Sequence, residues 1–153
     1  MSDKALSHLE KTLGYTFTNK KLLRTALTHK TYAFEAKTPL EYNERLEFLG
    51  DSVLGTVVAE QLYKGNRYFS EGDLTRRRSN GVNNRYLAKR AETLGIGSFV
   101  LFGRGELKQH GAKNQTNLAN ALEAIIGAMY LDSSLERVQQ FIIEKVFTKD
   151  FQF

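Results

Sequence analysis

The stretch NERLEFLGDSVLG, from Asn43 to Gly55, places three acidic side chains in an otherwise apolar run. Glu44, Glu47 and Asp51 are separated by three and four positions, so in a helix they share one face. Like charges on one face repel each other, and burying a carboxylate costs several kcal/mol unless the charge is compensated. The spacing therefore indicates either a bound cation or a face that stays in water.

A second apolar run, NLANALEAIIGAMYL, repeats this pattern. Asn120 and Glu123 are the only polar side chains of its central part, and they stand three positions apart. If the two helices face each other, these side chains can form a four-oxygen site with Glu47 and Asp51. Mg²⁺ and Mn²⁺ bind such all-oxygen sites. The alternative is a solvated acidic stripe that pairs with Arg45 or with lysines elsewhere.

Helices must position both runs, and the sequence predicts an all-α fold. Cap residues and glycine stops and apolar residues at helical spacing predict helices over residues 2–14, 18–29, 38–65 and 83–95, one starting at residue 70, and others over 116–132 and 135–147.

Local signals set some of these boundaries. Thr38 and Glu41 form a capping box around Pro39, which predicts the start of the long helix. A second box, formed by Ser133 and Glu136, precedes the last helix. The interior glycines of the long helix predict close packing against a neighbour, because a helical glycine costs roughly 1 kcal/mol relative to alanine. The segment IGSFVLFGRGELKQHGAKNQ is expected to be a loop, and SFVLF within it is the only fair strand candidate.

Composition excludes several classes of site. The 153 residues contain no cysteine, which excludes disulfides, thiolate metal sites and a cysteine nucleophile. No apolar run approaches the ~20 residues of a membrane span, and the N-terminal sequence lacks a signal-peptide core. We therefore expect a single cytoplasmic domain over residues 1–153. The net charge of +5 permits a polyanionic partner without identifying one.

The three histidines, His8, His29 and His110, do not suggest a catalytic pair. A ribonuclease that works without metal usually needs such an acid–base pair. We expect His29 instead to be a structural hydrogen-bonding residue near the acidic site.

The run NERLEFLGDSVL resembles the signature of the ribonuclease III family. Three companion segments occur in the family's order, namely ALTHKTYAFE (residues 26–35), SEGDLT (70–75) and LANALEAIIGAMYLD (118–132). The resemblance covers nearly the whole chain. It implies an all-helical, homodimeric endonuclease domain that cuts double-stranded RNA with Mg²⁺, or with Mn²⁺ as a substitute. Metal-activated water would leave 5′-phosphate and 3′-hydroxyl ends with short 3′ overhangs.

The same resemblance assigns roles residue by residue. Glu47, Asp51 and Glu123 match the catalytic carboxylates, and with Asn120 they match the metal ligands. Most bacterial members have aspartate where this chain has Asn120. The neutral amide removes one negative charge, so we expect weaker Mg²⁺ binding and slower chemistry.

Three further positions match family residues around the site. Glu44 and Glu71 match auxiliary acidic positions that line the valley for RNA. Phe48 matches the aromatic side chain that inserts into a socket on the partner subunit. The alternative for Phe48 is an ordinary core residue.

RNA contacts are expected from two basic groups. We assign them to Arg76, Arg77 and Arg78 and to Arg104 and Lys108, although a run of charges is usually a solvated face. Family enzymes commonly continue into a double-stranded-RNA-binding domain, and this chain ends at FTKDFQF. Without that domain, we expect RNA affinity to be low and strongly dependent on salt.

Two other functions fit parts of the sequence. Asn120 favours a catalytically silent module that binds structured RNA or a protein partner. A metal-dependent phosphohydrolase acting on small substrates is a weaker alternative.

Overall fold

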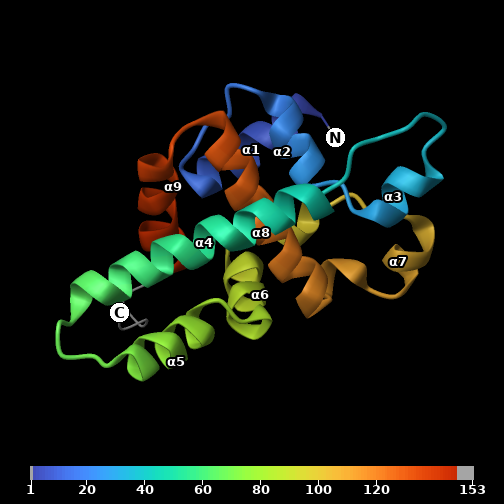
Figure 1. Cartoon of the computed structure of the whole chain (residues 1–153). Coiled ribbons are helices and arrows are strands. Elements are labelled where there is room, and N and C mark those ends of the chain that lie inside the picture. Colours follow the sequence, from blue (N-terminus) through green and yellow to red (C-terminus); the bar gives the residue numbers. More distant parts are fainter. Residues whose placement is uncertain (1, 148–153) are drawn as a thin grey trace.

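The computed structural model describes residues 2–147, which form an arrangement of helices (Figure 1). The α-helices are α1 (Asp3–Leu13), α2 (Lys20–Ala26), α3 (Lys30–Glu35), α4 (Glu44–Gly65), α5 (Glu71–Gly81), α6 (Asn84–Thr93), α7 (Arg104–Lys108), α8 (Gln115–Asp132) and α9 (Leu135–Phe141). Short 3₁₀ turns η1 (Ile96–Ser98) and η2 (Gly111–Lys113) flank α7, and a π-helical turn η3 (Ile142–Val146) follows α9.

The predicted all-α class is confirmed. Within residues 2–147 the only β-type pairing is an isolated bridge between Thr28 and Leu101. The strand candidate SFVLF does not form a strand: its first residue, Ser98, ends η1, and only Leu101 takes part in the bridge. In the same part of the chain, no helix is long and apolar enough to cross a membrane. The predicted extension of the domain to residue 153 includes residues 148–153, which lie outside the described part.

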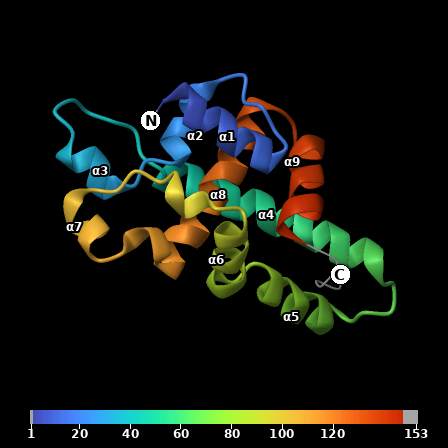
Figure 2. The ribbon, with the colours of Figure 1, turned by 180° about the vertical axis from the view of Figure 1, so that it is seen from behind.

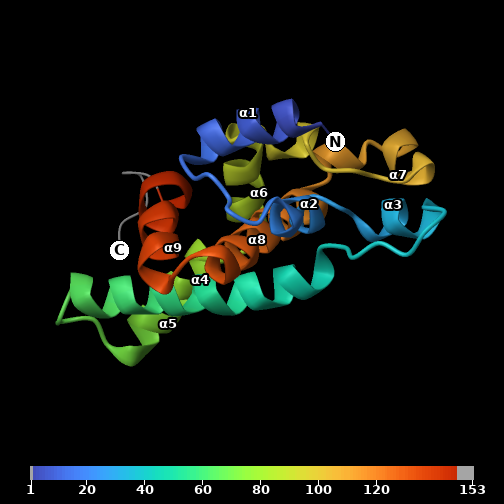
Figure 3. The same cartoon turned by 90° about the horizontal axis from the view of Figure 1, so that it is seen from above.

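Helix α8 is the centre of the fold. Every residue from Ala121 to Met129 is buried, including Glu123. Its main packing partners are α4 and α6, and Figure 3 shows α8 between these two helices. A helix that is apolar nearly all round is stable only when its neighbours cover it. The prediction of a buried helix over residues 116–132 is therefore confirmed.

Helix α4 is covered on one side only. Its buried residues are Leu46, Gly50, Val53, Leu54, Val57, Val58 and Leu62. The outer side carries Phe48 and Tyr63, both exposed to solvent, and Asp51 is exposed at the edge of the contact face. The high apolar content of this run predicts a helix that its neighbours bury nearly all round, and that prediction is wrong for α4. The number of apolar residues alone does not determine burial, and no helix formed by residues 2–147 lies over the outer side of α4 (Figure 3).

Two glycines let α4 and α8 cross at backbone contact. A Cβ added to Gly50 would lie 1.8 Å from the backbone oxygen of Glu123, and one added to Gly127 would lie 2.2 Å from that of Leu46. The predicted close packing is confirmed at Gly50. It was wrong at Gly55, where an added Cβ would meet nothing within 4 Å.

One predicted helix start and one predicted helix cap were wrong. Helix α4 begins at Glu44 rather than near Thr38, because the Asn43 N–H donates to the Thr28 carbonyl at 2.9 Å and holds the preceding segment in a non-helical connection. The last helix is capped by Ser134, which accepts from the Arg137 N–H, rather than by Ser133. By contrast, the cap at Ser70 is confirmed as a capping box with Asp73.

Two short helices, α3 and α7, were not predicted. They lie together at one end of the molecule (Figures 1 and 2). The Gly103 N–H donates to the Thr31 hydroxyl at 3.0 Å, and the Arg104 N–H donates to the Glu35 carboxylate at 2.9 Å. These bonds join segments about 70 positions apart, so no local sequence pattern reveals them. These two bonds tie α3, which precedes α4 in the chain, to the start of α7, which precedes α8.

Candidate active site

The crossing of α4 and α8 gathers three carboxylates. Gly50 lies one turn after Glu47 and directly before Asp51, and its backbone touches that of Glu123. Burial is the largest cause that raises the pKa of Glu123 above its ordinary value. The charges of Asp51 and Glu47 also raise it, and together the three effects bring it to about 8. The carboxylates predicted from two separate helices are therefore electrostatically coupled.

The Glu123 carboxyl group has no compensating partner among residues 2–147. Its exposed fraction is 6%, and within those residues it takes part in no side-chain hydrogen bond or ion pair. Burying an unpaired carboxylate is costly, so such a group keeps its proton until a cation stabilises the charge. The raised pKa of Glu123 therefore favours its protonated form near neutral pH.

Glu47 is a milder case of the same effect. It is half-buried, and its pKa is raised by burial first and then by the charge of Glu44, while Lys30 acts in the opposite direction. Asp51 is exposed at the edge of the same helix face. The three acids thus differ in exposure, from the buried Glu123 through the half-buried Glu47 to the exposed Asp51. The side of the cluster at Asp51 is therefore open to a large anionic substrate.

The donor set fits a divalent cation that is completed by other oxygens. Among residues 2–147, no group of three or more His, Cys, Asp or Glu side chains is arranged to hold a metal ion by itself. Mg²⁺ typically takes one or two carboxylates and fills its other positions with water and substrate phosphate. Glu47, Asp51 and Glu123 supply the charge, and Asn120 lies one turn before Glu123 on α8.

Glu44 differs from the other acids because a lysine compensates it. Lys30 Nζ lies 2.9 Å from Glu44 Oε1, and both side chains are about half exposed. The hydrogen bond to Glu44 raises the pKa of Lys30. The solvated, paired alternative is thus correct for Glu44. Sequence reasoning missed Lys30, whose only signal was its place within the segment ALTHKTYAFE.

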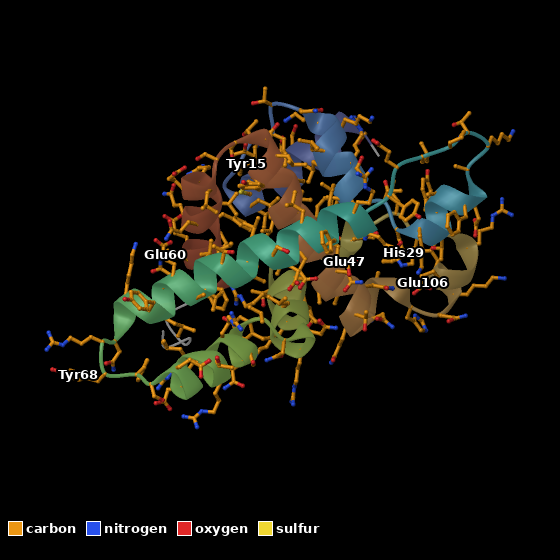
Figure 4. All side chains as sticks on the ribbon, in the orientation of Figure 1. Tyr15, His29, Glu47, Glu60, Tyr68 and Glu106 are labelled. Atoms are coloured by element: carbon orange, nitrogen blue, oxygen red, sulfur yellow. The ribbon has the colours of Figure 1, made fainter. Side chains whose placement is uncertain are left out.

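His29 has the structural role that was predicted. Its ring Nδ1 lies 2.8 Å from the Thr31 hydroxyl, and its side chain caps α3. Burial lowers the pKa of His29, and the nearby Glu106 acts in the opposite direction. Figure 4 shows His29, Glu47 and Glu106 on the same side of the molecule. Glu106 also accepts a hydrogen bond from the Asn117 amide at 2.7 Å, which ties α7 to the start of α8.

Phe48 points away from the core. Its exposed fraction is 78%, so the alternative of an ordinary core residue is excluded. It lines a cavity of about 1000 Å³ together with Leu40, Leu49 and Leu131. A large exposed aromatic beside an apolar cavity is an arrangement that a second molecule can cover.

Glu71 is not brought to the carboxylates within one chain. It begins α5, which starts beyond the far end of α4 (Figure 1). The 22 residues of α4 span about 33 Å at 1.5 Å per residue. Its carboxylate instead accepts a hydrogen bond from the Thr75 hydroxyl at 2.8 Å.

The two basic groups lie at opposite ends of the molecule. Arg76, Arg77 and Arg78 are on α5, while Arg104 and Lys108 are on α7 (Figure 1). All but Arg77, which is half-buried, are exposed. Arg76 is paired with Asp73 at 2.7 Å.

The chain matches known proteins over most of its length. A family model described as Ribonuclease-III-like matches residues 19–150. The proteins named Ribonuclease 3 from Idiomarina loihiensis and Nitrosomonas eutropha are 46% and 50% identical over 138 and 131 residues, which are 90% and 86% of this chain. These stretches cover 58% and 51% of the two relatives, so the chain spans little more than half of their length.

Solved structures match more completely. A crystal structure of the nuclease domain of ribonuclease III from Campylobacter jejuni has a TM-score of 0.86 and 39% identity, with 95% of both chains covered. A second structure of that domain, with a TM-score of 0.84 and 40% identity, covers 90% of this chain and 93% of its own. The latter describes structural flexibility in a region involved in dimer formation.

Proposed function

Because the chain belongs to the ribonuclease III family, we propose that it is an endonuclease domain that cuts double-stranded RNA with the help of a divalent cation. The observation that carries the proposal is the buried, unpaired Glu123 facing two carboxylates of α4. A purely structural acid at this position would be expected to have a cationic or hydrogen-bonding partner. The uncompensated cluster is instead suited to a cation that arrives with substrate.

Glu47, Asp51, Asn120 and Glu123 would hold the cation, Mg²⁺ or Mn²⁺. When bound, the cation supplies Lewis-acid polarisation of the phosphate and neutralises developing negative charge. Glu123 must give up its proton to act as a ligand, since only the ionised carboxylate binds a hard cation well. Asp51, at the exposed edge, is the ligand that the backbone of an RNA strand meets first.

The net reaction is hydrolysis of a phosphodiester. Water adds to phosphorus, the bond from phosphorus to the 3′ oxygen breaks, and the 3′ oxygen takes up a proton. The products carry 5′-phosphate and 3′-hydroxyl ends. Two cuts by two such sites, offset across the minor groove, would leave the short 3′ overhangs.

The proposed assembly is a homodimer through the face that carries Phe48. That face combines an exposed ring with an apolar cavity of about 1000 Å³. The dimer formation described for the related Campylobacter jejuni domain supports the same arrangement here. Because Phe48 directly follows Glu47 in α4, burying the ring would fix the position of a cation ligand. Glu44 and Glu71 would then act as auxiliary acids along the RNA-binding face.

Basic residues of α5 and α7 would contact the RNA backbone. The exposed Arg78, Arg104 and Lys108 have the side chains that neutralise phosphates. Because they are few and lie on two separate helices, we expect binding to weaken steeply as salt rises.

A second candidate is a catalytically impaired member that binds structured RNA or a protein partner. Asn120 favours it, because a neutral amide stands one turn from Glu123 where the family mostly has aspartate. The two candidates share the fold and the RNA-binding face and differ only in turnover.

Cleavage of an end-labelled blunt RNA duplex at low salt, with Mg²⁺ or Mn²⁺, tests the proposal. We expect 5′-phosphate products from the unmodified chain and none from Glu123→Gln, with the corresponding DNA duplex as a control. If the unmodified chain binds the duplex without cutting it, and Asn120→Asp restores cleavage, the impaired candidate is supported. Turnover of a small phosphodiester without attack on the duplex would support the phosphohydrolase alternative.

A further inference from the structure

The end of the molecule farthest from α3 and α7 exposes two tyrosines that the proposed active site does not use. This end, here called the α4–α5 tip, comprises residues 63–78, from the last turn of α4 to the middle of α5 (Figure 1). Tyr63 and Tyr68 have exposed fractions of 75% and 81%, and Figure 4 shows Tyr68 pointing away from the body. Large side chains this exposed, on one feature of the surface, indicate a contact with another molecule.

The tip holds its aromatic residues in place. The Asn66 side chain accepts a hydrogen bond from the Tyr68 N–H at 2.9 Å. The Arg77 guanidinium lies 4.1 Å from the centre of the Phe69 ring and anchors the loop to α5. The Arg67 guanidinium lies 5.2 Å from the centre of the Tyr68 ring. A ring held in this way loses little conformational entropy when something stacks on it.

The charge of the tip is strongly positive. Residues 63–78 contain five basic and two acidic side chains. Lys64 is paired with Glu60 at 2.6 Å and Arg76 with Asp73 at 2.7 Å. Arg78 forms no ion pair with any residue of the described range 2–147, so its charge is available to an anion.

A cavity of about 360 Å³ lies between the two helices of the tip. It is lined by Ala59, Glu60, Leu62 and Tyr63 of α4 and by Leu74, Thr75 and Arg78 of α5, and the Glu60 carboxylate is paired with Lys64. Its volume is at the lower end of the range for small-ligand sites, roughly 300–1,000 Å³. An aromatic wall, apolar side chains and one guanidinium suit a planar ring attached to a phosphate.

We propose that the α4–α5 tip binds unpaired nucleotides of RNA by stacking them on Tyr63 and Tyr68 while the arginines neutralise the adjoining phosphates. Bases in single strands stack on exposed aromatic side chains and on guanidinium planes, whereas bases within a duplex are not accessible in this way. The proposal rests on the proposed function only in assuming that RNA is the substrate class.

The position of the tip gives this contact a specific role. Tyr63 lies 16 residues beyond Glu47 on the same helix, which is about 24 Å along the axis. Unpaired nucleotides at the tip would therefore lie about 24 Å along α4 from the carboxylates of the same chain. The tip would favour stems that continue into a loop or a single strand over uninterrupted duplexes.

The test measures binding without cleavage, by fluorescence anisotropy at low salt with EDTA. The probes are a blunt RNA duplex, the same duplex with an unpaired oligoadenosine extension, and the oligoadenosine alone. We expect the extension to tighten binding by about fivefold or more, the lower end for stacking of one base. The double variant Tyr63→Ala with Tyr68→Ala should lose this gain and keep its affinity for the blunt duplex.

Matched variants separate stacking from general effects. Tyr63→Phe with Tyr68→Phe should keep the gain, because the rings remain. Phe34→Ala, which removes a ring that is 72% exposed on α3, should also keep it. An equal gain in the double alanine variant, or no gain in the unmodified chain, would overturn the proposal. Tyrosine-dependent binding of the oligoadenosine, with no binding of the blunt duplex in EDTA and no cleavage of it in the separate Mg²⁺ assay, would instead overturn the proposed function and leave the tip site standing.

Discussion

Glu123 is the residue at which burial and chemistry conflict most directly. Its ordinary pKa of 4.5 is raised to about 8 by burial and by two neighbouring carboxylates. Between these two values the native protein holds a proton that the unfolded chain releases. The contribution of Glu123 to the free energy of unfolding therefore falls as the pH rises through this range, with a slope that approaches about 1.4 kcal/mol per pH unit.

We predict that Glu123→Gln flattens this decline in the metal-free protein. The amide keeps the shape of the protonated acid and cannot ionise, so it removes the source of the slope. Urea unfolding at intervals from pH 5 to pH 8 measures the effect. The matched variant Glu136→Gln changes an exposed acid at the start of α9 and should keep the slope. Equal slopes in the unmodified chain and in Glu123→Gln would show that Glu123 ionises normally.

Asn120→Asp adds the charge that the site lacks relative to most of the family. We expect the Mg²⁺ concentration for half-maximal cleavage to fall by about tenfold, the lower end of what changes around metal ligands produce. Without metal, the new carboxylate stands three positions from Glu123 and should destabilise the fold by about 0.2–0.5 kcal/mol above the pKa of Glu123, where both carboxylates are ionised. Cleavage assays and thermal unfolding measure the two effects. If neither changes, residue 120 is not a ligand.

At this scale the sequence predicted the identity of the acids better than their environment. The spacing on each helix placed Glu47, Asp51 and Glu123 on faces that do meet. It could not show that Glu44 is compensated, because Lys30 is 14 positions away on another helix. Which carboxylate is paired depends on tertiary distances, and a one-dimensional pattern does not contain them.

At the scale of elements, the crossing of α4 and α8 is what holds the acids together. We predict that Gly50→Ala destabilises the fold by about 3 kcal/mol, the upper end for overpacking. Its Cβ would fall 1.8 Å from a backbone oxygen of α8, and a backbone atom cannot move aside as a side chain can. Urea unfolding measures the loss, and cleavage should fall with it, because the helices must separate.

Gly55→Ala is the matched control on the same helix. An added Cβ there meets nothing within 4 Å, so the change should stabilise α4 by about 0.5–1 kcal/mol. A stability loss at Gly55 as large as that at Gly50 would mean that helix contact is not the cause.

Elements with strong local signals were predicted well, and those fixed by distant contacts were not. Ser70 begins α5 as expected, because its capping partner is three positions away. The start of α4 was missed, since it depends on a bond from Asn43 to Thr28. Helices α3 and α7 are short and depend on each other, with Glu35 accepting from the Arg104 backbone. Tertiary contacts override local propensity in such segments.

At the scale of the whole molecule, one side of α4 is not covered by any helix of the described residues 2–147 (Figure 3). Phe48 is 78% exposed there, beside a cavity that includes Leu49 and Leu131. A second copy related by a twofold axis would cover ring and cavity at once, because a twofold interface pairs each surface with its equivalent.

We predict that Phe48→Ala weakens the dimer by about tenfold or more, as expected when a central aromatic of an interface is truncated. Sedimentation velocity over a range of concentrations measures the change. Tyr68→Ala, which removes an equally exposed ring at the α4–α5 tip, should leave the sedimentation profile unchanged. Since Phe48 is adjacent to Glu47, cleavage at low protein concentration should fall with the dimer and recover as the concentration rises. A loss of cleavage that no concentration restores would mean that Phe48 acts on the site within one chain.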